Sequence, residues 1–154
     1  MAALIIACCW SDENNNRAIE VDRNHKVIAT FTAGGTVSGV AFASRLPNGR
    51  TLITDSNNNR IVEVDAHDHP VWEYLTNTDS HSNPAPLPTR AIRTRDGKTI
   101  ISDQFNQRVL IVNKAGTIVA HYGNLNAAGF GAPITPARGS MGRTTPNASA
   151  TTPA

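Results

Sequence analysis

Three segments of this 154-residue chain align without a gap, and this repetition constrains the fold more than any other feature. Each segment opens on the pattern Asp-x-x-Asn-x-Arg and continues into an apolar, strand-like run. The three segments are SDENNNRAIEVDRNHKVIATF (Ser11–Phe31), TDSNNNRIVEVDAHDHPVWEY (Thr54–Tyr74) and SDQFNQRVLIVNKAGTIVAHY (Ser102–Tyr122). Their first aspartates stand at positions 12, 55 and 103. Periods of this length predict a propeller or a solenoid, in which each repeat is one supersecondary unit.

Each repeat contains four short runs that are rich in β-branched residues and separated by turn residues, which is typical of strands. No stretch shows a helical period. For the middle repeat the predicted strands, named a to d, are Val40–Leu46, Thr51–Asp55, Arg60–Asp65 and Val71–Leu75. The third repeat follows the same plan from about residue 89 to residue 122. Four-stranded units at this period are blades of a β-propeller.

Two dipeptides mark the turn between strands a and b. Asn48-Gly49 and Asp96-Gly97 are typical of tight hairpin turns whose two central residues both have positive φ. The predicted fold class is therefore all-β: a β-propeller segment of about three four-stranded antiparallel blades, arranged as an incomplete ring.

The predicted organisation has two parts. Residues 1–123 form a partial first blade, which lacks strand a and begins near Ala7, and two full blades. Residues 124–154 are expected to be an aborted fourth blade and a disordered tail rich in Pro, Thr and Ala. Closed propellers have about 4–8 blades. Two explanations remain open, namely a fragment of a larger propeller, which we favour, and self-association that completes the ring.

Composition excludes several classes of partner. The formal net charge is +2 and aromatic residues make up 5% of the chain, which argues against nucleic-acid binding. The apolar start MAALIIACC is too short to span a bilayer and has no basic leader. The two cysteines, Cys8 and Cys9, are adjacent, so they predict neither a disulfide framework nor a zinc site.

The aligned words DENNNRAIEVD, DSNNNRIVEVD and DQFNQRVLIVN resemble the NHL-repeat family of β-propellers, and the repeats are also similar to those of arylsulfotransferase-type propellers. The resemblance covers roughly residues 10–123. It implies the fold, with a binding side on the face of the b–c turns and d–a loops. It does not imply one activity, since such propellers include binding scaffolds, RNA-binding modules, lyases and lactonase-like enzymes. It is compatible with an extracytoplasmic location but leaves the compartment open.

The repeated motif is interpreted as a turn clamp. Asp55 ends strand b and Arg60 begins strand c, so the two side chains face each other across the hairpin, while Asn58 suits the break between them. A calcium site is the rival interpretation, but each loop has few carboxylates and an opposing arginine. We therefore predict no metal. The clamp residues are Asp12 and Arg17; Asp55, Asn58 and Arg60; and Asp103, Asn106 and Arg108.

Candidate ligand-binding residues come from two places. Arg45, Arg90 and Arg93 lie on strand a, where clustered guanidinium groups would suit a phosphate, sulfate or carboxylate, although arginines at a blade interface are the alternative. Asp79 and His81 lie in the long loop (Thr76–Pro88), and loops of this kind often carry function.

The predicted function is a binding scaffold for a protein or a small, anionic ligand, within a larger NHL-repeat protein. One alternative is a segment of a propeller enzyme that resembles arylsulfotransferases, lyases or lactonases. Another is an RNA-binding NHL module, for which Arg95 would join the arginines of strand a. No complete catalytic constellation is visible, so enzymatic activity and cofactors stay open.

Overall fold

The structure is a computed structural model that describes residues 8–80 and 82–123. The first sheet contains β1 (Cys8–Asp12), β2 (Arg17–Val21) and β3 (Val27–Phe31), with the short 3-10 turn η1 (Glu13–Asn15) between β1 and β2. The second contains β4 (Val40–Arg45), β5 (Thr51–Asp55), β6 (Arg60–Val64) and β7 (Pro70–Leu75). The third contains β8 (Pro88–Arg93), β9 (Thr99–Asp103), β10 (Arg108–Val112) and β11 (Ile118–Tyr122). The expected aborted blade and disordered tail, residues 124–154, lie outside the described residues.

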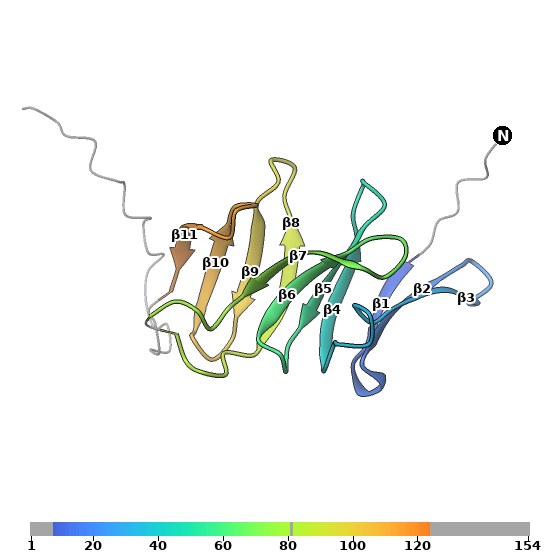
Figure 1. Cartoon of the computed structure of the whole chain (residues 1–154), viewed down its shortest axis with the longest axis horizontal. Coiled ribbons are helices and arrows are strands. Elements are labelled where there is room, and N and C mark those ends of the chain that lie inside the picture. Colours follow the sequence, from blue (N-terminus) through green and yellow to red (C-terminus); the bar gives the residue numbers. More distant parts are fainter. Residues whose placement is uncertain (1–7, 81, 124–154) are drawn as a thin grey trace, which may run out of the picture.

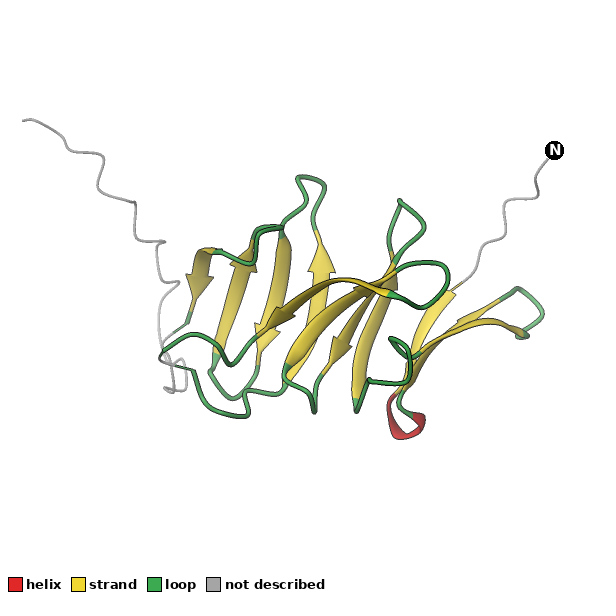
Figure 2. Cartoon of the chain, in the orientation of Figure 1, coloured by secondary structure: helices red, strands yellow, loops and turns green. Residues whose placement is uncertain are grey.

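The three sheets confirm the predicted fold class. Apart from η1, every regular element in the described part of the chain is a strand (Figure 2). Within each sheet the strands are antiparallel and follow chain order, and the sheets stand side by side like vanes rather than closing on themselves (Figure 1). The inner strand β4 lies between β1 and β8. In the second sheet, β5 has its predicted bounds, and the other predicted bounds differ by one residue at most.

The hairpins between strands a and b form as expected, but the predicted turn type was wrong. Only the glycines have positive φ, 79° at Gly49 and 82° at Gly97. The Leu46 N–H donates to the Arg50 carbonyl at 2.8 Å, and the Gly49 N–H donates back to Leu46 at 3.0 Å. The loop therefore has three residues, one more than the two-residue loop that Asn-Gly favours, and glycine takes its left-handed position.

The core consists of two layers, each between neighbouring sheets. On β5, Ile53 faces the first sheet and Leu52 faces the third, because successive side chains of a strand alternate. Every residue of β5 is buried as a result. Each fully buried Leu or Ile contributes roughly 1.5–3 kcal/mol relative to exposure. Packing between repeats thus buries apolar side chains that one sheet alone would leave exposed.

The third sheet has one covered face and one half-exposed face. On β9 and β10, buried and partly exposed residues alternate, and Ile92 on β8 is 40% exposed. The covered face packs on the second sheet through Ala91, Ile101 and Leu110. No helix within residues 8–80 and 82–123 has the length and apolar character needed to cross a bilayer.

Candidate functional site

The clamp of the second repeat closes the turn between β5 and β6. Asp55 and Arg60 are direct cross-strand partners, and Arg60 Nε donates to Asp55 Oδ2 at 2.5 Å. Asn58 Nδ2 donates to both carboxylate oxygens, at 3.0 and 2.9 Å. The Asp55 side chain is fully buried. Charge-assisted bonds in a water-poor setting hold this turn in one conformation.

The same clamp also binds the incoming connection from the first sheet. The Ser38 N–H donates to Asp55 Oδ1 at 2.7 Å, and Arg60 Nη2 donates to the Thr36 hydroxyl at 2.7 Å. Each bond spans more than fifteen residues of sequence, so the motif joins two loops as well as one hairpin. Arg60 Nη1 also donates to Glu73 of β7 at 2.7 Å, so the arginine bonds to three elements at once.

The clamps of the other repeats keep the central bonds but differ in burial. In the first, Arg17 Nε donates to Asp12 at 2.7 Å and the Arg17 side chain is 40% exposed. In the third, Arg108 Nε donates to Asp103 at 2.7 Å and its side chain is 4% exposed. The equivalent asparagines, Asn15 and Asn106, donate to the same aspartates at 2.9 Å.

The long loop is fastened to the third clamp. Asp79, a predicted ligand residue, accepts a hydrogen bond from Arg108 Nη1 at 2.7 Å. The Asn83 N–H donates to Asn106 Oδ1 at 2.8 Å, and Asn83 Nδ2 donates to the Phe105 carbonyl at 2.7 Å. His81, the other predicted loop residue, lies outside the described residues. The loop and the β9–β10 turn therefore present one joined surface.

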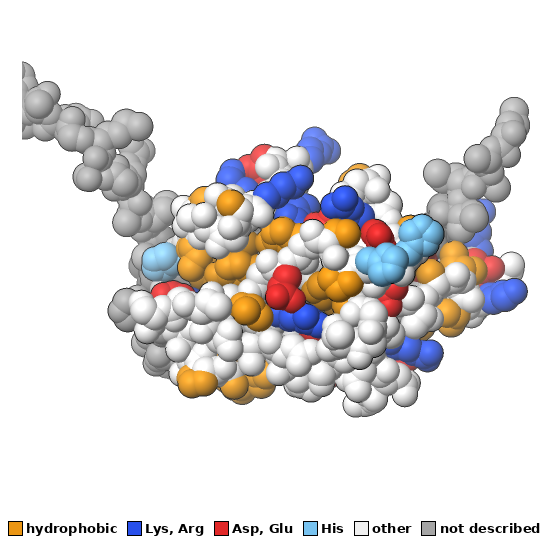
Figure 3. Space-filling view, in the orientation of Figure 1, with side chains coloured by type: hydrophobic (Ala, Val, Ile, Leu, Met, Phe, Trp, Pro, Cys, Tyr) orange, Lys and Arg blue, Asp and Glu red, His pale blue; other side chains and the backbone are white. Residues whose placement is uncertain are grey.

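Phe105 is an exposed aromatic residue on this surface, and it is not among the residues predicted from the sequence. Its side chain is 49% exposed. The equivalent positions of the other repeats hold Asn14 and Asn57. The change from asparagine to phenylalanine within an otherwise polar turn was the signal that could have identified it. At the lower edge of Figure 3, where the b–c turns lie, the surface is mostly uncharged and carries apolar side chains.

The predicted ligand residues Arg45 and Arg93 both lie in blade interfaces. Arg93 Nη2 donates to Glu63 of β6 at 2.7 Å, and its guanidinium lies 4.6 Å from the ring centroid of Trp72. Arg45, at the equivalent position, lies 3.8 Å from Glu20 of β2. Each arginine thus links its own sheet to the preceding one.

Arg90 lies apart from this pair. Its guanidinium stacks 4.6 Å from the centroid of the Phe42 ring, which occupies the equivalent register on β4. The three arginines of strand a therefore do not form one cluster. Among the predicted ligand residues that the structure describes, only Arg93 lines a cavity between the second and third sheets.

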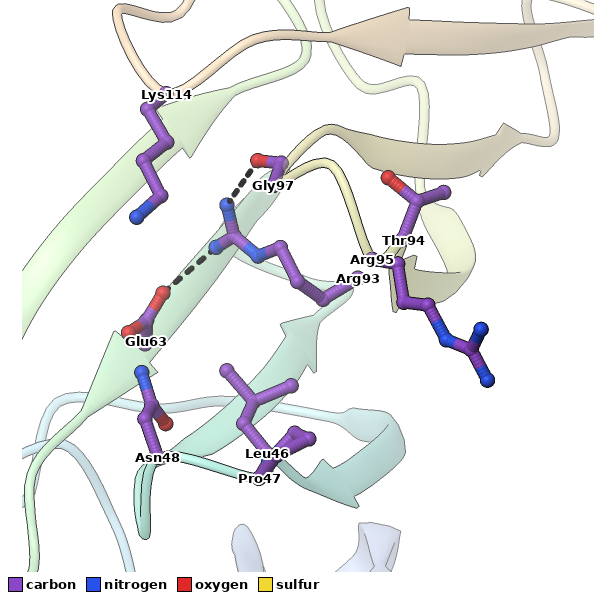
Figure 4. Close-up of a pocket in the computed structure, with 9 residues that line it drawn as sticks. All are labelled: Leu46, Pro47, Asn48, Glu63, Arg93, Thr94, Arg95, Gly97 and Lys114. Carbon is purple, nitrogen blue, oxygen red and sulfur yellow. Dashed lines mark hydrogen bonds and ion pairs between the residues drawn. The ribbon is translucent and has the colours of Figure 1, made fainter.

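This cavity has a volume of about 390 Å³ and opens on the side of the a–b turns (Figure 4). Its lining residues are Leu46, Pro47, Asn48, Glu63, Arg93, Thr94, Arg95, Gly97 and Lys114. Burial lowers the pKa of Arg93, and the neighbouring Glu63 carboxylate offsets this only in part. Basic side chains gather around the nearby β8–β9 turn in Figure 3.

Among the described residues, no group of three or more His, Cys, Asp or Glu side chains could hold a metal ion. No family model matches the sequence, and no curated protein matches it.

Comparison with solved structures finds β-propellers. A catalytically inactive variant of virginiamycin B lyase from Staphylococcus aureus with quinupristin aligns with a TM-score of 0.60 and 17% identity, over 78% of this chain and 38% of that one. A streptogramin B lyase aligns at 0.57 and 14%, over 78% and 45%. The WD40 propeller domain of Doa1 aligns at 0.52 and 15%, over 79% and 49%. The chain thus spans less than half of each, and the likeness shows the fold: this chain folds as a segment of a β-propeller.

Proposed function

We propose that this chain is part of an NHL-type propeller scaffold that binds a protein partner on the face of the b–c turns and d–a loops. The observation that carries the proposal is the exposed Phe105 side chain on a surface that the third clamp and the long loop hold together. Aromatic side chains in well-ordered surroundings are typical anchors of protein interfaces. Phe105 stands on a turn rather than in a cavity, which favours a protein over a small ligand.

The anchoring bonds support this proposal energetically. Binding costs free energy when loops must become ordered, and a surface that is already fixed avoids much of that cost. Asn83 and Asp79 each connect the long loop to the third clamp through bonds of 2.7–2.8 Å. A partner would therefore meet a preformed surface.

Site-specific photo-crosslinking tests the proposal. A photoreactive phenylalanine analogue is placed at Phe105 or, as a control, at Val119, whose side chain is 47% exposed on the outer strand β11. In an extract of the organism that makes this chain, we expect a discrete protein adduct from position 105 and none from position 119. The Asp79→Ala change, which removes one of the bonds that fasten the long loop, should weaken the adduct. Equal labelling from both positions would refute the proposal.

Further blades would complete the ring. The described residues supply three sheets, whereas closed propellers have about 4–8 blades. We infer that these blades come from a longer polypeptide or from a second copy of the chain. Sedimentation equilibrium of this chain separates the two sources, since only the second gives a dimer.

A second candidate is a lyase-type propeller enzyme, which the likeness to virginiamycin B lyase and streptogramin B lyase favours. Its test is incubation with quinupristin, followed by liquid chromatography coupled to mass spectrometry, because ring opening by elimination gives an isomer of unchanged mass. Time-dependent conversion into a species of the same mass and a different retention time would support the enzyme. An unchanged chromatogram would leave the scaffold as the better supported function.

A further inference from the structure

The cavity between the second and third sheets departs from the repeat pattern in its charge. The Arg93–Glu63 ion pair is a feature of the repeat, because Arg45 and Glu20 occupy the equivalent positions one junction earlier. Lys114 is not a feature of the repeat, since the equivalent residue of the second repeat is Ala66. The second junction therefore adds a cation to an ion pair that both junctions share.

The acidic group in the cavity is already neutralised. Glu63, whose side chain is 6% exposed, accepts from Arg93 at 2.7 Å and from Arg50 at 3.1 Å. One carboxylate thus faces two guanidinium groups. Within the described part of the chain, Lys114 makes no ion pair with a carboxylate. The balance of charge around the cavity is positive, and the exposed Lys114 ammonium at its rim favours an anion.

Three polar side chains of the cavity, those of Lys114, Arg93 and Asn48, lie around Glu63. Figure 4 shows the Lys114 ammonium and the Arg93 guanidinium directed into the region above Glu63, whereas the Arg95 side chain turns away. The Asn48 amide oxygen accepts the Arg50 N–H at 3.1 Å, and Figure 4 shows the Asn48 amide nitrogen pointing toward Glu63 from the side opposite Lys114. The Lys114 side chain lies over Gly97, where an added Cβ would stand 3.3 Å from its Cε.

We propose that this cavity binds a small organic carboxylate, with Lys114 and Asn48 as donors to its oxygens and with Leu46 and Pro47 against its apolar body. A monoanion suits the cavity better than a phosphate dianion, because Arg93 and Arg50 already pair with Glu63 and only the Lys114 ammonium is left to meet the ligand charge. The volume is within the range of small-molecule sites. The site lies on the side of the a–b turns, opposite the surface around Phe105, so it is independent of the partner surface.

The indole of Trp72 provides a local reporter. Its Nε1–H donates to the Lys114 carbonyl at 2.8 Å, and its ring makes a cation–π contact with the Arg93 guanidinium. The chain has two tryptophans, so its NMR spectrum contains two indole N–H resonances, which a Trp10→Phe change assigns. The chain is titrated with benzoate, with uncharged benzyl alcohol and with phenyl phosphate, each to about 10 mM, where a Kd of about 1 mM is measurable.

We expect benzoate to shift the Trp72 resonance saturably and benzyl alcohol to leave it in place. Lys114→Met should weaken benzoate binding about tenfold or more, since it removes a charge-assisted bond. Lys26→Met removes the same charge from an exposed turn of the first repeat and should have no effect. An unchanged Lys114→Met affinity, or no saturable shift with benzoate, would overturn the site. Tighter binding of phenyl phosphate than of benzoate would overturn the carboxylate assignment.

Discussion

Ser38 donates its backbone N–H to Asp55 at 2.7 Å, and the third repeat lacks this bond because Pro86 stands in the place of Ser38. The equivalence is visible in the backbone, since the Ser38 and Pro86 carbonyls accept N–H groups from equivalent turn residues. Asp103 Oδ1 is consequently buried without a hydrogen-bond partner among the described residues. Proline has no N–H to give.

The Pro86→Ala change should therefore stabilise the chain by about 1 kcal/mol, because the gain of a bond to a charged acceptor exceeds the loss of proline's rigidity. Urea unfolding followed by circular dichroism measures the difference. Pro84→Ala, in the same loop, loses the rigidity without gaining this bond and should be slightly destabilising. Equal stabilities of the two variants would contradict the assignment of Asp103 as an unsatisfied acceptor.

The second prediction compares the Asp–Arg clamp in two repeats that differ in how far the clamp is buried. Asp55→Asn removes the buried carboxylate partner of Arg60, whose side chain is 15% exposed and keeps its ion pair with the exposed Glu73, and should cost about 2 kcal/mol of the free energy of unfolding. Asp12→Asn removes the equivalent partner of the exposed Arg17 and should cost much less, because water replaces the contact. The urea concentrations at the unfolding midpoints of both variants measure the two losses of stability. Similar losses at both positions would mean that burial does not set the strength of the clamp.

The sequence was sufficient to predict the strands and the cross-strand pairing of Asp55 with Arg60. Both follow from the alternation of side chains along a strand and from the short turn between the two strands. The sequence could not show where the Arg45 and Arg93 side chains point. Alternation places both on the same face of their strands but does not say whether that face meets the central channel or the neighbouring blade. The Asn-Gly turn type was wrong because the chain uses a longer hairpin loop with glycine alone at positive φ.

The cavity could not be predicted for a different reason. Its donors come from Asn48 in one a–b turn and Lys114 in a c–d turn of the next repeat, and each alone is an ordinary turn residue. Only the packing of the second sheet on the third brings them together. The contact of Asp68 with Thr32 likewise spans 36 residues and depends on how far the outer strand twists.

The third prediction concerns that contact. The Asp68 carboxylate accepts N–H groups from Thr32, Ala33 and Gly34 at 2.9–3.2 Å and the Thr32 hydroxyl at 2.7 Å. Asp68→Ala should cost about 2–3 kcal/mol of stability, since several N–H groups lose a charged acceptor. His25→Ala is the matched control, because His25 has the same left-handed backbone, with φ 61° against 66°, and lacks these contacts. Losses of equal size would show that only backbone strain was measured.

The fourth prediction concerns Cys9, whose thiol packs against the core between the first and second sheets. Burial raises its pKa from 9.0 to about 11, the Glu20 carboxylate adds to the rise, and Arg45 opposes it. The folded state therefore holds this proton more tightly than the unfolded state, so stability is retained below pH 9 and falls as the pH rises from about 9 to about 11. In a Cys8→Ser background, thiolate absorbance should titrate near pH 11 in the folded chain and near 9 in urea. Cys9→Ala should remove this part of the pH dependence of unfolding, and a folded-state midpoint near 9 would show that the thiol is open to water.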